Sequence, residues 1–225
     1  MLSIPSSGFG PQIERCIQGV VDSAAAAHGF DPSLELRLSA EFGESERQRV
    51  AEYLNLVVQW GERLDLTAAR DEDELVDLFV ADAVVLAASA NEVQDWVDIG
   101  TGAGAPGLPL QLFRPNLQMS LVEPRAKRVA FLRSAVGGLH ADDIRVVRGR
   151  SEAVPDAAHE VAVSRATWAP DRWLTEGARL ARRHVWVLLA TAEPPTLPGW
   201  QVDAHCRYEW PLTGVARSAL RFVRI

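Results

Sequence analysis

The chain has 225 residues, of which 48% are hydrophobic and 24% are charged, and its formal net charge is −7. This composition predicts a globular protein with one main core, and the lack of an apolar run of about 18 residues argues against a membrane-spanning helix. An acidic balance is unusual for a nucleic-acid-binding protein, which generally carries a basic surface. The start, MLSIPSSGFGPQ, lacks the pattern of a secretion signal, and the two distant cysteines, Cys16 and Cys206, predict reduced thiols rather than a disulfide framework or a metal site. We therefore expect a cytoplasmic protein.

Residues 1–90 are predicted to be mainly helical. An Ala-rich patch lies at 24–27, and residues 45–48 have the spacing of a capping box. After it, apolar residues recur at helical spacing over 50–64, and another helix is predicted to begin near Asp71. We interpret this region as a helical cap.

From residue 93 short apolar runs alternate with helical stretches. The predicted strands are 93–99, 117–123, 144–147, 160–164 and 184–190, and the predicted helices begin at 106 and cover 127–136 and 173–181. This alternation is typical of βαβ units that build a parallel sheet. Two later β-like runs, 202–210 and 219–225, are separated by the segment PLTG and predict an antiparallel pair at the sheet edge. Residues 91–225 are thus predicted to form an α/β domain.

The segment VDIGTGAGAPG, residues 97–107, is the most informative motif. It follows a predicted strand and begins a predicted helix. Glycine permits positive φ angles and close approach of a ligand to the backbone, and the free amides at a helix start favour polar or anionic groups. Doubly wound sheets bind their ligands at the carboxyl ends of the strands. We expect a ligand here; the alternative is a glycine-rich turn that binds none.

Two classes of ligand fit this loop. The glycines from Gly102 to Gly107 match the dinucleotide-binding spacing GxGxxG, and Glu123 follows about 20 residues later, as that pattern requires. However, the strand end carries an acid, Asp98, where a dinucleotide-binding strand normally stays apolar. The segment DIGTGAG, 98–104, is the pattern of the S-adenosylmethionine loop in Rossmann-like methyltransferases, and we favour this cofactor over a nicotinamide dinucleotide.

Two further segments belong to the predicted cofactor site. Glu123 ends the second predicted strand, where its carboxylate can accept hydrogen bonds from both ribose hydroxyls; the alternative is a solvated acid at a strand end. Ser151 and Glu152 follow the third predicted strand, where a methyltransferase contacts the adenine. The alternative for this pair is a helix N-cap with an acid in the first turn.

Four runs carry a family resemblance: NLVVQWGERLDLTAARDEDEL, VDIGTGAGAPGLPLQLFRPNLQMSLVEPRAKRVAFLRSAV, VVRGRSEA and VSRA. They closely resemble the bacterial 16S ribosomal RNA guanine-N7 methyltransferases, the glucose-inhibited-division B proteins. The resemblance covers residues 45–166 strongly and the C-terminal hairpin weakly. Within it, GLPLQLFRPNLQ and KRVAFLR are specific to the family, because methyltransferases in general share only the glycine loop and the acid.

The resemblance implies an α/β, Rossmann-like methyltransferase sheet that is mostly parallel, with an antiparallel C-terminal edge and an N-terminal helical cap. It also implies S-adenosylmethionine as cofactor, 16S ribosomal RNA or the small ribosomal subunit as partner, and Arg165 as a residue facing cofactor or RNA. We expect a monomer with no membrane or metal partner. The cofactor-binding residues predicted in this way are Asp98, Gly100, Thr101, Gly102, Gly104, Ala105, Glu123, Ser151, Glu152 and Arg165.

No catalytic side chain is assigned. Guanine N7 already offers a lone pair, so we expect the rate to come from alignment of the reacting atoms and from desolvation. The five histidines, His28, His140, His159, His184 and His205, have no metal-ligand spacing and are interpreted as structural or surface residues.

The chain departs from the family pattern at three places. Ala105 replaces a larger apolar residue, Leu78 and Phe79 occupy two basic positions with Ala83 in place of a serine, and residues 190–192 lack a Lys-Gly pair. Two alternatives therefore stay open: a methyltransferase that acts on a small molecule or another RNA, and a non-catalytic binding module.

Three side chains beyond the predicted strand at 160–164 have two interpretations each. Arg165 binds a phosphate or a base, or it forms a salt bridge at the sheet edge. Trp168 and Trp173 are the two candidates for base stacking, although core packing is the favoured interpretation for both.

Overall fold

The computed structural model describes residues 2–26, 42–90 and 94–225. Seven strands form one sheet in the order β3-β2-β1-β4-β5-β7-β6. The strands are β1 (Asp95–Ile99), β2 (Gln118–Glu123), β3 (Ile144–Arg148), β4 (His159–Ser164), β5 (Ala181–Leu189), β6 (Trp200–Trp210) and β7 (Val215–Arg224). The helices are α1 (Gly10–Ala26), α2 (Glu44–Gly61), α3 (Glu72–Val76), α4 (Asp82–Ser89), α5 (Gly107–Phe113), α6 (Ala126–Gly138) and α7 (Pro170–Leu180).

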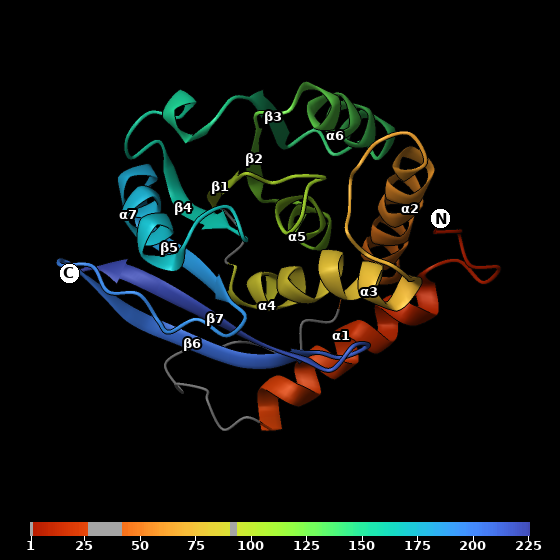
Figure 1. Ribbon diagram of the computed structural model, residues 1–225, viewed down its shortest axis with the longest axis horizontal. Coiled ribbons are helices and arrows are strands. Elements are labelled where there is room, and N and C mark those ends of the chain that lie inside the picture. Colours follow the sequence, from red (N-terminus) through yellow and green to blue (C-terminus); the bar gives the residue numbers. More distant parts are fainter. Residues whose placement is uncertain (1, 27–41, 91–93) are drawn as a thin grey trace.

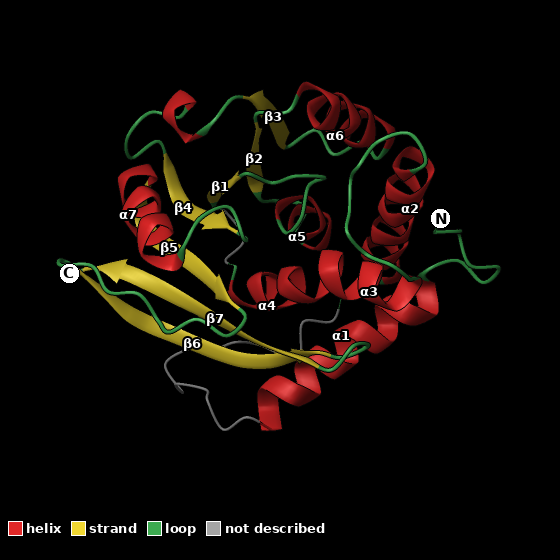
Figure 2. Ribbon diagram, in the orientation of Figure 1, coloured by secondary structure: helices red, strands yellow, loops and turns green. Residues whose placement is uncertain are grey.

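The sheet confirms the predicted α/β class. Strands β1 to β5 pair in parallel, whereas β7 is antiparallel to both β5 and β6. Figure 2 shows β6 and β7 as a long hairpin at one edge of the sheet. β7 begins at Val215, directly after the turn, and not at residue 219 as predicted, because each of residues 215–218 pairs with a residue of β6.

Helices cover both faces of the sheet. On one face α5 and α6 pack on β2 and β3, and α2 and α4 pack against α5; on the other, α7 packs on β4 and β5. Each face has its own hydrophobic cluster, and the larger one joins residues of α1, α2 and α4 to residues of the strands. The division into a cap, 1–90, and a sheet domain, 91–225, remains a prediction, and its boundary at 91–93 lies outside the described residues.

The helix starts of the N-terminal region differ from one another. The predicted capping box is wrong: α2 begins at Glu44 after the N-cap residue Gly43, two residues before the predicted N-cap Ser45, and the Gly43 position provides no side-chain cap. By contrast, Asp71 caps α3 as predicted, since its Oδ1 accepts from the Glu74 amide at 2.8 Å. α3 continues through a π-helical turn over Asp77–Ala81 into α4. Of the predicted Ala-rich patch, α1 includes residues up to Ala26, and the rest lies outside the described residues.

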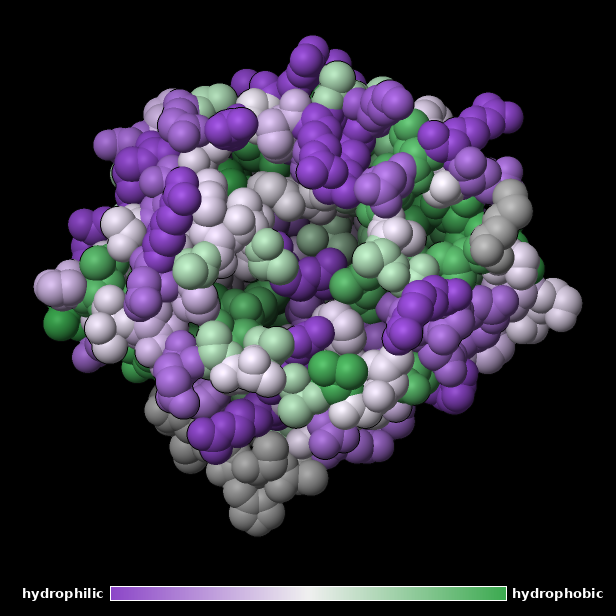
Figure 3. Space-filling view, in the orientation of Figure 1, coloured by the Kyte–Doolittle hydropathy of each residue, from purple (hydrophilic) through white to green (hydrophobic). Residues whose placement is uncertain are grey.

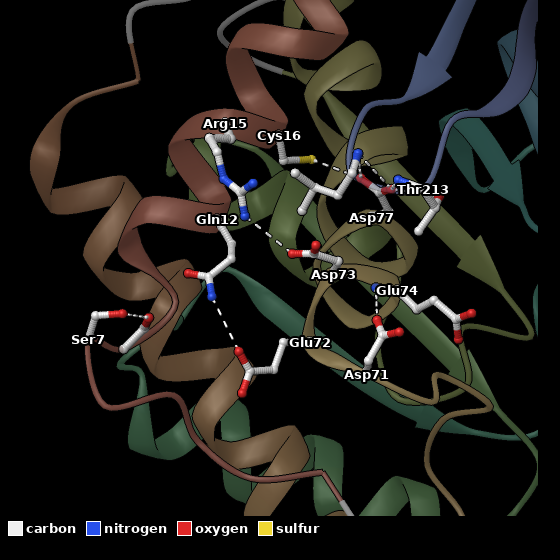
Figure 4. Close-up of polar contacts among 12 residues, drawn as sticks. Ser7, Gln12, Arg15, Cys16, Asp71, Glu72, Asp73, Glu74, Asp77 and Thr213 are labelled. Carbon is white, nitrogen blue, oxygen red and sulfur yellow. Dashed lines mark hydrogen bonds and ion pairs between the residues drawn. The ribbon is translucent and has the colours of Figure 1, made fainter.

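A buried carboxylate joins the two ends of the fold. Asp77 accepts hydrogen bonds from the amides of Leu212 (3.1 Å) and Thr213 (2.8 Å), in the turn between β6 and β7, and from the Thr213 hydroxyl (2.8 Å). The thiol of Cys16, on α1, donates to the same side chain at 3.7 Å (Figure 4). Both Cys16 and Cys206 are buried free thiols, as predicted.

Candidate functional site

A cavity of about 850 Å³ opens at the carboxyl ends of β1, β2 and β4. The glycine loop, Glu123 and the turn at 149–152 line one side. Residues 65–68, Leu78 and Phe79 of the helical region, with residues 165–168 after β4, line the other. Figure 3 shows the hollow near the middle of this face. The carboxyl edge of the sheet is where doubly wound folds bind their ligands.

The glycines of the loop serve two different purposes. Gly100, Gly102 and Gly104 all have positive φ angles, of 70°, 64° and 114°. A Cβ added to Gly100 would lie 2.4 Å from Thr167 Oγ1, and one added to Gly104 would lie 2.9 Å from Tyr53 Oη, so both glycines are needed for contacts within the protein. At Gly102 the nearest atom would be Arg128 Nη1 at 3.7 Å. Gly102 is therefore the glycine whose open side faces the cavity.

Asp98 supports the loop from behind. It is fully buried, and its Oδ2 accepts from the Thr101 hydroxyl at 2.7 Å and from the Gly107 amide at 2.9 Å. Its Oδ1 has no hydrogen-bond partner among the described residues, and burial raises the pKa of this carboxyl from 3.8 to about 6. Neither Asp98 nor Gly104 lines the cavity, whereas the other eight predicted cofactor residues do.

Glu123 connects the loop to the neighbouring strand. Its Oε2 accepts from the Gly102 amide at 3.0 Å, and its Oε1 accepts from the Arg125 amide at 2.8 Å. The side chain is buried but lines the cavity, which disagrees with the alternative of a solvated strand-end acid. Each carboxylate oxygen has two lone pairs, so acceptor capacity remains for a ligand.

Two supporting contacts were not predicted. The hydroxyl of Tyr53, on α2, donates to the carbonyl of Ala103 at 2.7 Å and so fixes the loop from the helical region. Arg179, on α7, donates to the carbonyl of Ser151 at 2.9 Å and to that of Val154 at 3.1 Å, and it fixes the 3-10 turn at 151–153. The spacing around Tyr53 predicts only a buried helix face, and no signal marked Arg179.

Arg165 belongs to both the cavity and a salt bridge. Its Nη1 donates to the carbonyl of Leu78 and to Asp82 Oδ2, the latter at 3.1 Å. The other oxygen of Asp82 accepts from Tyr208 Oη (2.6 Å) and Trp210 Nε1 (2.9 Å), both on β6. The salt-bridge alternative is therefore confirmed, and Arg165 still lines the cavity.

The two tryptophan candidates for base stacking differ in position: Trp173 lies in the core and Trp168 lines the cavity. Trp173 is buried and its Nε1 donates to the carbonyl of Trp186 at 2.7 Å, which is a core position. Trp168 stacks on Trp173, with ring centroids 6.3 Å apart and an interplanar angle of 16°, and it lines the cavity. Arg172 lies over the Trp168 ring at 5.1 Å.

The described part of the chain contains neither a membrane-spanning helix nor a metal-binding cluster. No helix there is both long and apolar enough to cross a bilayer. Within the same residues, no group of three or more His, Cys, Asp or Glu side chains could hold a metal ion. Of the five histidines, His28 lies outside that part of the chain.

Residues 46–193, about two thirds of the chain, match the family model GidB, described as rRNA small subunit methyltransferase G. The chain belongs to this GidB family. The resemblance found in the sequence is therefore confirmed, and the loop, Glu123 and Arg165 all lie within the matched region.

Curated relatives cover part of the chain. The ribosomal RNA small subunit methyltransferase G of Neisseria meningitidis serogroup C is 36% identical over 129 residues, which are 57% of this chain and 62% of the relative. The protein of the same name from Clostridium botulinum (strain Loch Maree) is 31% identical over 136 residues, 57% of each chain. The chain thus spans about three fifths of the length of the curated relatives that it matches.

Solved structures agree with the fold. TYW2 of P. horikoshii in complex with MeSAdo has a TM-score of 0.51 at 12% identity and is covered over 62% of its length by 64% of this chain. TYW2 of M. jannaschii in complex with AdoMet has the same TM-score and identity, over 64% of this chain and 75% of that one. These similarities confirm the Rossmann-like methyltransferase sheet.

Proposed function

We propose that this GidB-family chain is an S-adenosylmethionine-dependent methyltransferase that methylates N7 of a guanine in 16S ribosomal RNA. The observation that carries the proposal is the pairing of Gly102 with Glu123 at the cavity. The bare backbone of Gly102 lets a ligand come close, and Glu123 fixes that backbone while facing the same space. The names of the curated relatives and the AdoMet complex of a protein with the same fold support this proposal.

The residues present fit the cofactor. Glu123 has acceptor capacity for the ribose hydroxyls, and the turn at 151–153, whose residues Ser151 and Glu152 line the cavity, would contact the adenine. The loop residues from Gly100 to Ala105 would surround the remainder, while Asp98 would act from behind the loop and not by contact. When bound, S-adenosylmethionine supplies a methyl group on a positively charged sulfur, which makes that carbon electrophilic.

The contribution of the chain to the reaction would be alignment and exclusion of water. Guanine N7 carries an in-plane lone pair, so no side chain has to remove a proton before methyl transfer. Phe79 is almost fully buried in the cavity wall and Leu78 lines it as well, so this wall is poorly hydrated. Arg165, fixed by Asp82, presents its remaining N–H groups for an acceptor on the base. Such positioning accounts for large rate effects without acid–base chemistry.

Methyl transfer to ribosomal subunits tests this function. Small subunits from a strain that lacks the protein are incubated with the purified chain and labelled S-adenosylmethionine, and the modified nucleotide is mapped. We expect incorporation at N7 of a single guanine. Subunits already modified in the parent strain are the control and should accept no label. Absence of label in both samples would contradict the proposal.

A second function has one observation in its favour. Leu78 and Phe79 make the cavity wall apolar where the family has basic residues, which suits a small molecule or a different RNA. Cofactor binding in calorimetry together with no transfer to subunits would favour this alternative, and absence of cofactor affinity would favour a non-catalytic binding module. A cytoplasmic location, a ribosomal partner and a monomeric state remain predictions.

A further inference from the structure

A smaller hollow of about 270 Å³ lies beside the cavity. Four cationic residues line it: Arg63, from the segment after α2, and Arg125, Lys127 and Arg128, at the start of α6. We call it the basic hollow. Arg125 and Arg128 line the cavity as well, so the two spaces are contiguous. Figure 3 shows hydrophilic residues gathered over α6, beside the central hollow.

The cations of the basic hollow outnumber its acids, and no ion pair with the described part of the chain neutralises them. Asp65 is the acidic residue that lines it, against four cations, in a chain whose net charge is −7. None of the four cations forms an ion pair with another described residue. Some arginines elsewhere do form ion pairs, for example Arg15 with Asp73 at 3.3 Å and Arg221 with Asp203 at 2.9 Å.

Arg128 gives a second, independent indication of a ligand. Its Nη2 donates to the carbonyl of Asp65 at 3.2 Å, which fixes the guanidinium between the two spaces. Its Nε is buried and has no acceptor among the described residues. A buried donor without a partner costs about 1–3 kcal/mol, so an acceptor from a ligand would remove this cost.

We propose that the basic hollow binds the phosphates of a single-stranded RNA segment next to the base that enters the cavity. This inference rests on the function proposed above. The carboxylate of a cofactor in the cavity would pair with one cation. Arg63 and Lys127 do not line the cavity, so a ligand confined to the cavity would not reach them. A nucleotide whose base is in the cavity brings its phosphates to the rim, which is where the four cations lie. The phosphates of an RNA strand therefore account for all four cations of the basic hollow.

The test uses variants that leave the cavity intact. Arg63→Gln combined with Lys127→Gln removes two exposed cations of the hollow, and Arg183→Gln combined with Arg207→Gln removes two exposed cations on β5 and β6 as a matched control. Affinity for a short single-stranded RNA with one guanine is measured by fluorescence anisotropy over a series of salt concentrations. S-adenosylmethionine affinity of each variant is measured by calorimetry.

We expect the first pair to weaken RNA binding roughly tenfold and to reduce the slope of log affinity against log salt by about 1.4, since each phosphate contact to a single strand contributes about 0.7. Cofactor affinity should stay unchanged in both pairs, and RNA affinity should change less than twofold in the control pair. Equal losses in the two pairs, an unchanged slope, or no RNA binding by the wild type would each overturn the proposal. Failure of the cofactor titration in the wild type would instead contradict the proposed methyltransferase.

Discussion

The two walls of the cavity are built in opposite ways. The loop wall is polar main chain, and side chains fix it from three directions: Asp98 from below, Glu123 from the next strand and Tyr53 from α2. The opposite wall includes the apolar side chains of Leu78 and Phe79, and its cation, Arg165, is already paired with Asp82. The loop wall is therefore organised before any ligand arrives, whereas the other wall offers shape but little attraction for a polyanion.

The two walls therefore suit two different contributions to binding, contact with a rigid surface and electrostatic attraction. A small cofactor gains affinity from a rigid surface because few groups have to be ordered on binding. A ribosomal RNA substrate also needs electrostatic attraction, and the cations of the basic hollow, two of which line the cavity as well, can supply it. Four predictions examine this division, and each changes one support of the loop wall.

Glu123→Ala should have the largest effect. It removes the proposed ribose acceptor and leaves the amides of Gly102 and Arg125 without their partner. Hydrogen bonds to a charged group contribute about 1.5–3 kcal/mol each, so we expect S-adenosylmethionine affinity to fall by a factor of at least roughly 100 in calorimetry. Circular dichroism should show a retained fold, and near-normal cofactor affinity would refute the assignment of Glu123.

Asp98→Asn should remove a pH dependence of stability. Burial raises the pKa of Asp98 from 3.8 to about 6 in the folded protein, so the folded state binds this proton more tightly than the unfolded state. The stabilisation is present in full below about pH 4 and is lost as the pH rises through about 6. Between pH 4 and 7 the wild type should lose about 3 kcal/mol relative to the variant, at about 1.4 kcal/mol per pKa unit. Urea unfolding at several pH values measures the free energy of unfolding of both proteins. If the difference between wild type and variant did not change with pH, Asp98 would not carry a buried charge.

Substitutions at two loop glycines should separate folding from binding. An added Cβ at Gly104 would lie 2.9 Å from Tyr53 Oη, whereas at Gly102 its nearest neighbour would be Arg128 Nη1, at an ordinary contact distance of 3.7 Å. Both positions have positive φ, which adds backbone strain in either variant. We expect Gly104→Ala to reduce the free energy of unfolding by about 2 kcal/mol more than Gly102→Ala, and Gly102→Ala to lose more cofactor affinity. The reverse order in thermal unfolding would mean that Gly104 is not packed as described.

Tyr53→Phe should have the smallest effect. The variant keeps the buried ring but leaves the Ala103 carbonyl without its hydrogen bond. The expected loss is about 1 kcal/mol in the free energy of unfolding, with a cofactor affinity a few times weaker because the loop is fixed less firmly. Tyr208→Phe, which removes a hydrogen bond to Asp82, is a control of the same chemistry that leaves the loop unchanged. If the two variants had equal cofactor affinities, Tyr53 would have no role at the loop.

The sequence was sufficient for the parts of the fold that local pattern determines. The alternation of strands and helices gave the sheet class, and the DIGTGAG segment placed the site. Contacts between distant segments could not be predicted from local pattern. Examples are the hydrogen bonds of Tyr53 with Ala103, of Ser151 with Arg179 and of Asp82 with Tyr208, whose residues are 50, 28 and 126 positions apart. Periodicity reports which face of an element is buried, but not which partner covers it.

The glycine loop illustrates the same limit within one motif. The sequence analysis assigned Gly100, Gly102 and Gly104 to the ligand, because positive φ and close approach are the general reasons for glycine. The structure divides them, with Gly100 against Thr167 and Gly104 against Tyr53, and leaves Gly102 for the cavity. Asp98 was placed correctly in the motif, yet a one-dimensional pattern does not indicate which side of the loop its carboxylate supports.

The order of strands in the sheet has a consequence for biosynthesis. β7 is the last strand in chain order, yet it lies between β5 and β6, so a nascent chain that ends at Gly214 leaves those two strands with unpaired edges. Exposed strand edges promote association with other chains. A nascent chain whose β5 and β6 have left the ribosome before β7 should therefore be aggregation-prone, and chaperone capture should decline once β7 is inserted between them.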